Sequence, residues 1–222
     1  MAANAKELPK TDRELSVMIR ESFNKTISSS GSVFDFGVND ADYLVSPRID
    51  GKQVRCPAYK SWCDMLRRAC DGKYQQKYKT YIGVTVCDEW RSFMAFRDWW
   101  LKNHVDGWQL DKDLIGNGKE YSKDKCIYVP SWLNCFLINN EARRGNLPLG
   151  VSFAKRHKKY ASDCRNPLTG SGFRIGYFDS PDEAHEAWVR SKISFAYELR
   201  PRIEAIDARI FQRVIEVILN AK

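Results

Sequence analysis

Three short strand-like segments followed at once by a strong helix start constrain the fold more than any other feature of the sequence. The segments are Gly150–Val151, Lys159–Arg165 and Phe173–Phe178, and they are separated by a basic turn and by a turn rich in Gly, Pro and Ser. Residues 180–183 (SPDE) then supply an N-cap serine, a proline at the first helical position and a glutamate three residues after the cap. The pattern predicts an α+β protein with three strands followed by a long helix.

A second run of strands and a helix is expected between Gly107 and Asn134. Residues 107–115 alternate apolar and polar side chains, as a strand with one buried face does, and Asn117-Gly118 then turns the chain. Residues 126–129 form a second short strand, and Pro130-Ser131 opens a helix that we expect to end at residues 143–145. The predicted order is strand, turn, strand, helix.

Helices are also expected in the first half of the chain and at its end. Thr11 and Glu14 fit a capping box, which predicts an amphipathic helix to about Lys25. A further helix should begin at Pro57 and stop near Asp71, and residues 73–79 should form a polar loop. We expect Asp88 to cap a helix whose stripe is formed by Trp90, Phe93, Phe96, Trp100 and Leu101. Such aromatic side chains either stack on bases or form core, and their helical spacing favours core.

The last helix should follow Pro201. Its apolar residues repeat with heptad-like spacing for little more than two repeats. Such a stripe either forms a homodimer or docks back on its own chain, and so short a repeat favours docking. The stripe consists of Ile203, Ile206, Ile210, Val214 and Val217.

Composition bounds the class of protein. No apolar run in the 222 residues approaches the roughly 20 that a membrane span requires, and the N-terminus lacks the apolar middle of a secretory signal. The seven cysteines include no CxxC pair, which favours reduced thiols over a structural zinc site. We therefore expect a cytoplasmic protein without membrane association.

The positive charge is concentrated in one segment. The whole chain has a net charge of +8, and residues 143–174 alone contain eight basic residues against one acid, Asp163. Clustered cations release counterions when they bind a polyphosphate. This segment therefore indicates a nucleic-acid partner.

Residues 107–134 resemble the HNH-type, or ββα-metal, endonucleases, specifically those of tailed bacteriophages. The resemblance is carried by LDKD, a Gly-Asn-x-x-x-Tyr-Ser loop, Cys-x-x-Val-Pro and an asparagine on the following helix. It implies a ββα-metal module and a hydrolase that cuts or nicks double-stranded DNA with Mg²⁺ or Mn²⁺. A phage-encoded protein would act in the host cell cytoplasm.

The resemblance places metal ligands at Asp111, Asp113 and Asn134, and catalytic groups at Asp113, Lys112 and Asn134. Aligned from Asn134 without gaps, Asp113 falls on the general-base histidine of the family and Lys112 on its strand ligand, whereas a shift of two puts Asp111 on the base. No histidine lies between Gly107 and Asn134. Two alternatives stay open, an exposed cluster of ion pairs in a turn and a DNA-binding regulator or inhibitor built on a lapsed nuclease.

Residues Gly150 to Lys192 resemble the APETALA-two/ethylene-response type of DNA-binding domain. The matching residues are Gly-Val, Lys-Tyr-Ala and Ile-Gly-Tyr-Phe-Asp-Ser-x-x-Glu-Ala-x-x-Ala-Trp. The resemblance implies a three-stranded antiparallel sheet that lies in the DNA major groove, with the helix packed behind it as support. The plant domains have arginines at the positions of Ser152 and Ala154, so base preference does not transfer. A solvated basic face is the alternative. The predicted DNA-binding residues are Ser152, Lys155, Arg156, Lys158, Lys159, Arg165 and Arg174.

The sequence divides into four predicted segments. They are an N-terminal extension with a short helix (1–55), an HNH-like nuclease module (56–145), an APETALA-two-like module (146–199) and a C-terminal helix (200–222). The predicted partner is double-stranded DNA, and a homodimer through the last helix is the second predicted association.

Overall fold

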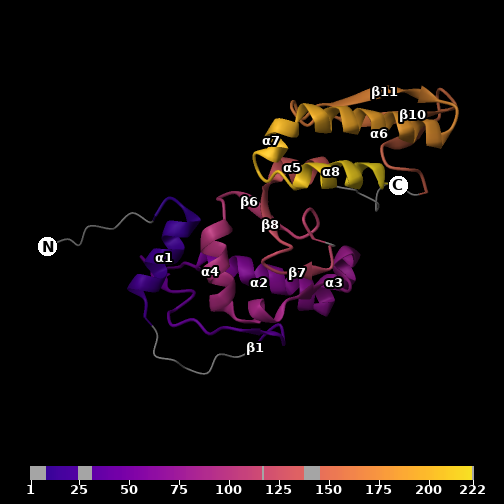
Figure 1. Ribbon diagram of the computed structural model, residues 1–222. Coiled ribbons are helices and arrows are strands. Elements are labelled where there is room, and N and C mark those ends of the chain that lie inside the picture. Colours follow the sequence, from indigo (N-terminus) through magenta and orange to yellow (C-terminus); the bar gives the residue numbers. More distant parts are fainter. Residues whose placement is uncertain (1–8, 25–31, 117, 138–145, 222) are drawn as a thin grey trace. The chain divides into compact units, whose positions relative to one another are not determined.

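The computed structural model describes residues 9–24, 32–116, 118–137 and 146–221. The chain separates into two compact units, Met1–Tyr128 and Val129–Lys222, and each unit is described on its own (Figure 1). The predicted boundary was at 145/146, later in the chain than this division. Residues 1–55 belong to the first unit, because Ile19 and Tyr43 are buried in its core.

The first unit consists of short helices and very short strands around an aromatic core. Its helices are α1 (Asp12–Ser22), α2 (Pro57–Cys70), α3 (Gly72–Lys77) and α4 (Phe93–Asn103), with 3-10 turns at Lys79–Tyr81 and Asp88–Arg91. Its strands are β1 (Ser32–Val33), β2 (Gly37–Val38), β3 (Arg48–Ile49), β4 (Lys52–Gln53), β5 (Thr85–Val86), β6 (Trp108–Asp111), β7 (Glu120–Tyr121) and the start of β8 (Ile127–Pro130).

Helices α1 and α2 form as the sequence predicted. The Thr11 side chain accepts from the backbone N–H of Glu14, and the Glu14 carboxylate accepts from that of Thr11, so both halves of the capping box are present. The apolar stripe of α2 includes Trp62, Met65 and Leu66, which are fully buried, and the helix packs against α1 and α4. Helix α1 ends at Ser22, and the predicted end at Lys25 lies outside the described residues.

Two predictions in this region were wrong. Residues 73–79, expected to be a loop, contain α3, because the Asp71 carboxylate accepts from the backbone N–H groups of Lys73 and Tyr74 and so caps a new helix. The helix expected to start at Asp88 is instead a short 3-10 turn followed by α4, which Ser92 caps. Trp90, Phe93, Phe96 and Trp100 are fully buried, so the core alternative describes these aromatic side chains.

Strand β6 is shorter than the predicted strand over residues 107–115. It ends at Asp111, pairs with β8, and leaves Asp113 in the bend that follows. Strands β5 and β7 form a separate parallel pair. Two small ladders, β6–β8 and β5–β7, therefore flank residues 112–116 and 118–119, which we call the polar loop.

The second unit has the predicted sheet backed by a helix. Strands β9 (Val151–Ala154), β10 (Lys159–Arg165) and β11 (Gly172–Phe178) form an antiparallel sheet in the order β11-β10-β9. Helix α6 (Pro181–Glu198) packs against all three strands, and the Ser180 side chain caps it by accepting from the N–H of Glu183. The α+β class and the three-stranded sheet are thus confirmed.

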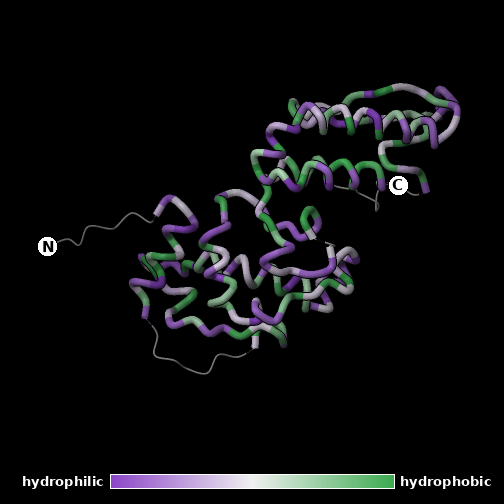
Figure 2. Tube along the Cα trace, viewed as in Figure 1, coloured by the Kyte–Doolittle hydropathy of each residue, from purple (hydrophilic) through white to green (hydrophobic). Residues whose placement is uncertain are grey.

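The other helices of this unit pack around α6. They are α5 (Ser131–Leu137), α7 (Arg200–Glu204) and α8 (Ile210–Leu219). The predicted end of the α5 helix at residues 143–145 lies outside the described residues. Hydrophobic residues gather along α8 (Figure 2), which buries Ile210, Val214 and Ile218 and packs on α5 and α6. The prediction of a single helix after Pro201 was wrong, because residues 205–209 form a turn, in which the Asp207 carboxylate accepts from the backbone N–H of Arg209, between α7 and α8. The docking alternative describes α8, while a homodimer stays a prediction.

In the part of the chain that the structure describes, no helix combines the length and apolar character needed to cross a membrane.

Candidate functional site

The register of the sheet assigns the predicted DNA-binding residues to one face. Directly paired residues of an antiparallel ladder point to the same side of the sheet, and alternate residues of a strand share a side. Ala161 pairs with both Ser152 and Tyr177, Asp163 pairs with Arg174, and Arg165 pairs with Gly172. The outer face therefore carries Ser152, Lys159, Arg165 and Arg174, together with Asp163 and Tyr177.

The opposite face of the sheet packs on α6. Val151 and Cys164 are buried there, and the ring of Phe173 meets that of Phe195 from α6 edge-on with centroids 6.0 Å apart. A β-bulge at Ser162/Asp163 lets Ile175 stand opposite no residue of β10, so that Arg174 comes opposite Asp163. The side toward α6 is thus largely buried, whereas Ser152, Arg165 and Arg174 on the other side are exposed.

The turn between β9 and β10 adds basic side chains at the end of this face. Lys155, Arg156 and Lys158 are all exposed. Lys158 has a φ of 51°, the left-handed conformation that lets a short turn close, and the N–H of His157 donates to the Ala154 carbonyl at 2.9 Å. The backbone therefore fixes the turn and leaves the basic side chains outside it.

Two of the predicted DNA-binding residues are engaged in ion pairs. The Arg174 guanidinium donates to both oxygens of the Asp163 carboxylate, at 2.6 and 3.2 Å, and this contact raises the pKa of Arg174. Lys159 Nζ lies 3.0 Å from the Asp179 carboxylate. Residues 150–179 contain six basic and two acidic residues, so a net charge of +4 remains on this segment.

Aromatic rings lie among the basic groups of the outer face, which the sequence reasoning missed. The Arg174 guanidinium carbon lies 4.9 Å from the centroid of the Tyr177 ring, and the His157 ring lies 4.3 Å from the same ring. Tyr177 is 41% exposed. The strand register puts Tyr177 beside Arg174 and the turn at residues 155–158. Without that register, the sequence does not indicate the cluster of His157, Arg174 and Tyr177.

The predicted nuclease residues of the first unit lie at the start of the polar loop. The Asp111 carboxylate accepts from the backbone N–H groups of Asp113 and Leu114, at 2.8 and 2.9 Å, and these bonds end β6. Burial raises the pKa of Asp111, although the two backbone N–H groups oppose that shift. The Asp111 carboxylate therefore stabilises the turn that follows β6.

Lys112 is held in place by an acid and two rings. Its side chain is 7% exposed, and its Nζ donates to Asp113 Oδ1 at 2.8 Å. The same nitrogen lies 5.8 Å from the centroid of the Tyr81 ring and 5.7 Å from that of Tyr121. Tyr121 is 2% exposed, so it packs in the core.

Asn134, the third predicted ligand, lies on α5. It belongs to the second unit, whereas Asp111 and Asp113 belong to the first. The structure therefore brings together Asp111, Lys112 and Asp113, and the complete predicted Mg²⁺ or Mn²⁺ site stays a prediction.

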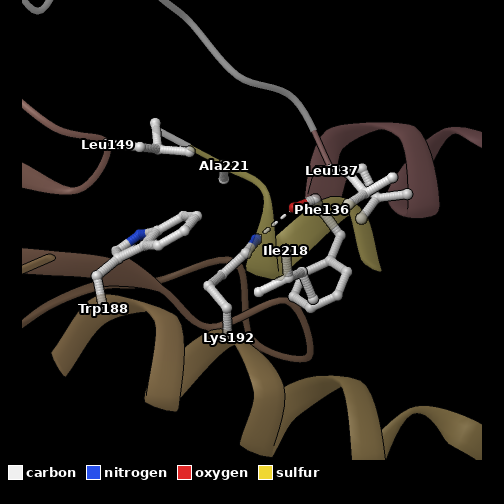
Figure 3. Close-up of a pocket in the computed structure, with 8 residues that line it drawn as sticks. Phe136, Leu137, Leu149, Trp188, Lys192, Ile218 and Ala221 are labelled. Atoms are coloured by element: carbon white, nitrogen blue, oxygen red, sulfur yellow. Dashed lines mark hydrogen bonds between the residues drawn. The ribbon is translucent and has the colours of Figure 1, made fainter. Parts of the chain in front are cut away.

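Sequence reasoning also missed a buried lysine in the second unit. Lys192 borders a cavity of about 30 Å³ with Phe136, Trp188 and Ile218, and its Nζ donates to the Phe136 carbonyl at the end of α5 (Figure 3). Burial lowers the pKa of Lys192 to about 8. In the sequence this lysine stands beside the apolar stripe of α6 and resembles an ordinary exposed residue.

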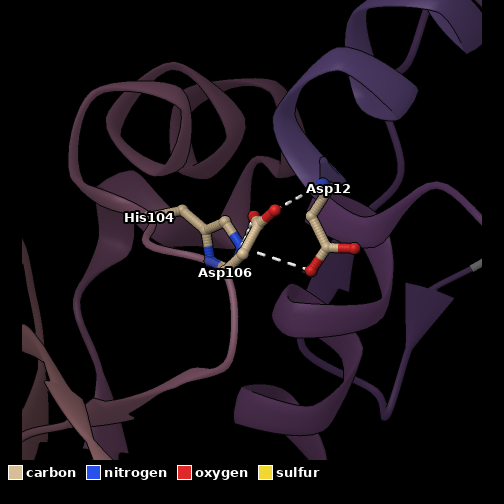
Figure 4. Close-up of side chains that lie close together, drawn as sticks. All are labelled: Asp12, His104 and Asp106. Carbon is tan, nitrogen blue, oxygen red and sulfur yellow. Dashed lines mark hydrogen bonds and ion pairs between the residues drawn. The ribbon is translucent and has the colours of Figure 1, made fainter. Parts of the chain in front are cut away.

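A second missed group, in the first unit, comprises Asp12, His104 and Asp106 (Figure 4). Asp12 is the first residue of α1, and the other two follow α4, so a sequence separation of 92 residues hid the cluster. Comparison with family models, with curated proteins and with solved structures found no match to this chain.

Proposed function

We propose that the protein binds double-stranded DNA through the outer face of β9–β11 and the turn at residues 155–158. The observation that carries the proposal is the strand register, which gathers Ser152, Lys159, Arg165 and Arg174 on the side of the sheet opposite α6. The basic residues of the turn extend that surface.

The shape and charge of the surface suit a duplex. Duplex DNA carries one negative charge per about 1.7 Å of its axis, and its major groove of about 12 Å admits two β-strands side by side. The seven-residue strands β10 and β11 are each on the order of 20 Å long, and they present cations along that length. A strip of this kind matches a row of phosphates better than it matches one carboxylate on a protein partner.

The roles of the residues differ by position. Lys155, Arg156 and Lys158 stand outside the turn on flexible side chains, which suits phosphate contacts that fix orientation. Arg165 is held by its Nε, which donates to the Gly170 carbonyl at 2.7 Å, so its guanidinium has a fixed direction. We assign Arg165 to a fourth phosphate contact, and Arg174 with Tyr177 to contacts within the groove.

Fluorescence anisotropy of a labelled duplex, repeated from low to high salt, tests this proposal. If the turn residues and Arg165 each contact one phosphate, log K falls against log salt with a slope of about −3.6, since each contact contributes about −0.9. Arg156→Ala and Arg165→Ala should each weaken binding and reduce that slope by about one. Binding that is absent at low salt, or unchanged in both variants, overturns the proposal.

DNA cleavage is a second candidate function, supported by the chain order of β6, β8 and α5, which is the strand, strand, helix order of ββα-metal nucleases. Asp111, Asp113 and Asn134 would hold Mg²⁺ or Mn²⁺, and water would attack phosphorus. Supercoiled DNA incubated with either ion should be nicked or linearised, and Asp113→Ala and Asn134→Ala should lose that activity. Binding without cleavage favours a regulator or inhibitor.

A further inference from the structure

We infer that Asp12, His104 and Asp106 form a binding site for one divalent transition-metal ion in the first unit. The three side chains converge on the imidazole Nε2, which lies 3.3 Å from Asp12 Oδ2 and 3.2 Å from Asp106 Oδ1 (Figure 4). This site shares no residue with the DNA-binding surface or with Asp111, Asp113 and Asn134.

The spacing of the ligand atoms fits a metal. Two ligands at about 2.1 Å from one ion are separated by roughly 3.0 Å at an octahedral angle and by roughly 3.5 Å at a tetrahedral angle. The two measured separations, 3.2 and 3.3 Å, lie in this interval, and all three ligand atoms lie within 4.8 Å of one another. An ion could therefore lie between Nε2 and the two carboxylates.

The imidazole is already positioned for coordination. His104 is stacked on Trp100, with centroids 4.1 Å apart and planes at 16°, and the Tyr128 ring meets it edge-on at 5.0 Å. Its backbone N–H donates to the Trp100 carbonyl, and its carbonyl accepts from Arg13 Nη2. The His104 side chain is 8% exposed, so Nε2 has little freedom to leave the cluster.

The charge of the cluster also calls for a cation. The Asp12 and Asp106 carboxylates both face Nε2 of His104. The backbone N–H of Asp12 donates to Asp106 Oδ2 at 3.2 Å and so holds that carboxylate toward the imidazole. A divalent ion neutralises both carboxylates.

The ligand set selects the class of ion. Imidazole suits Zn²⁺, Fe²⁺, Cu²⁺ and Ni²⁺, the two carboxylates also suit Mn²⁺, and Mg²⁺ or Ca²⁺ prefer all-oxygen sites. Asp12 and Asp106 are 50% and 43% exposed, so the outer side of the ion would face water. Three protein ligands with open positions are typical of a site where a water or an anionic oxygen completes the coordination.

Mn²⁺ is the preferred test ion, because the seven cysteines of the chain would compete for Zn²⁺. The full chain, freed of metal by a chelator, is titrated with Mn²⁺, and free Mn²⁺ is measured by electron paramagnetic resonance. We expect one Mn²⁺ ion per chain that is little displaced by an equal concentration of Mg²⁺. Asp12→Asn and Asp106→Asn, which keep side-chain size, should each weaken binding by at least about 100-fold.

Two matched variants locate the ion. Asp64→Asn removes another exposed carboxylate of the first unit, which pairs with Arg67, and should leave Mn²⁺ binding unchanged. In Asp113→Asn the Mn²⁺ ion that Mg²⁺ displaces little should remain bound. Loss of binding in Asp113→Asn alone would place the ion at the polar loop. Absence of binding, or equal binding in all variants, would show that the cluster is only a tertiary hydrogen-bonded contact. Each of these results overturns the inference.

Discussion

The polar loop of the first unit and the outer face of the β9–β11 sheet both combine lysine or arginine with aspartate, yet they use these charges differently. In the loop, Asp111 is engaged by backbone N–H groups and Lys112 by Asp113. On the sheet, Asp163 and Asp179 engage Arg174 and Lys159, while the basic turn residues extend into solvent. Residue type alone therefore does not indicate a binding site, because neighbouring acids and backbone groups decide which charges a partner can reach.

The largest expected effect comes from removing the charges of the turn. The triple variant Lys155→Ala, Arg156→Ala, Lys158→Ala should bind duplex DNA on the order of 100-fold more weakly at moderate salt, since three phosphate contacts are lost. The slope of log K against log salt should become shallower by about 2.7. Anisotropy titrations measure both quantities.

The matched control removes as many charges from the polar loop and the segment that follows it. In Lys119→Ala, Lys123→Ala, Lys125→Ala the net charge changes equally, and two exposed ion pairs, with Glu89 and Glu120, are lost. DNA affinity should fall only slightly. Equal losses in the two triple variants would mean that net charge, rather than the sheet face, governs binding.

A second prediction concerns Lys192, the buried lysine of the second unit. Lys192 has a folded pKa of about 8, below its ordinary value of 10.5, so between these values the unfolded chain binds more protons. Stability should therefore rise as pH increases from about 8 to about 10.5, by roughly 3 kcal/mol at most. Urea unfolding across this range measures the rise.

Lys192→Met is the control for this pH dependence, because it keeps the apolar stem beside Phe136 and Trp188 and removes the amine. The rise in stability should be largely lost in this variant. Retention of the full rise would assign it to another group.

The structural role of Asp111 is expected to have a smaller effect. Asp111→Ala removes the acceptor of two backbone N–H groups and should lower the free energy of unfolding by about 1–2 kcal/mol. Asp111→Asn keeps an acceptor oxygen and should cost less. If Asp111→Ala instead has the free energy of unfolding of the wild type and loses only metal-dependent DNA cleavage, Asp111 is a nuclease residue rather than a turn-forming one.

The smallest expected effect is a gain. Asp163→Asn releases Arg174 from an exposed ion pair, which contributes at most about 1 kcal/mol to stability. The freed guanidinium should raise DNA affinity a few-fold. Thermal unfolding and anisotropy of the same sample measure the two quantities, and a loss of affinity would indicate that Asp163 positions Arg174 for its contact.

Local rules predicted much of the fold. The caps at Thr11 and Ser180, the stripe of α2 and the three strands of the second unit are confirmed, because each depends on residues close together in the chain. The helix at α3 and the end of β6 were missed, since the Asp71 and Asp111 carboxylates act through backbone N–H groups that no hydrophobic pattern reveals.

The candidate sites were predictable in part for the same reason. The basic face could be predicted because strand alternation fixes which side Ser152, Arg165 and Arg174 occupy. The neutralising contacts of Arg174 and Lys159 depend on cross-strand geometry and a bulge. The cluster around His104 depends on tertiary contact between segments far apart in sequence, which a single sequence does not show.

Hydrogen–deuterium exchange of the full chain, with and without a saturating duplex of about 20 base pairs, tests the central claim most directly. Residues 152–178, which include the outer face of the sheet and the basic turn, should exchange more slowly on the duplex, while residues 111–125 should be unchanged. Protection confined to the polar loop, with residues 152–178 unaffected, would contradict DNA binding by the sheet.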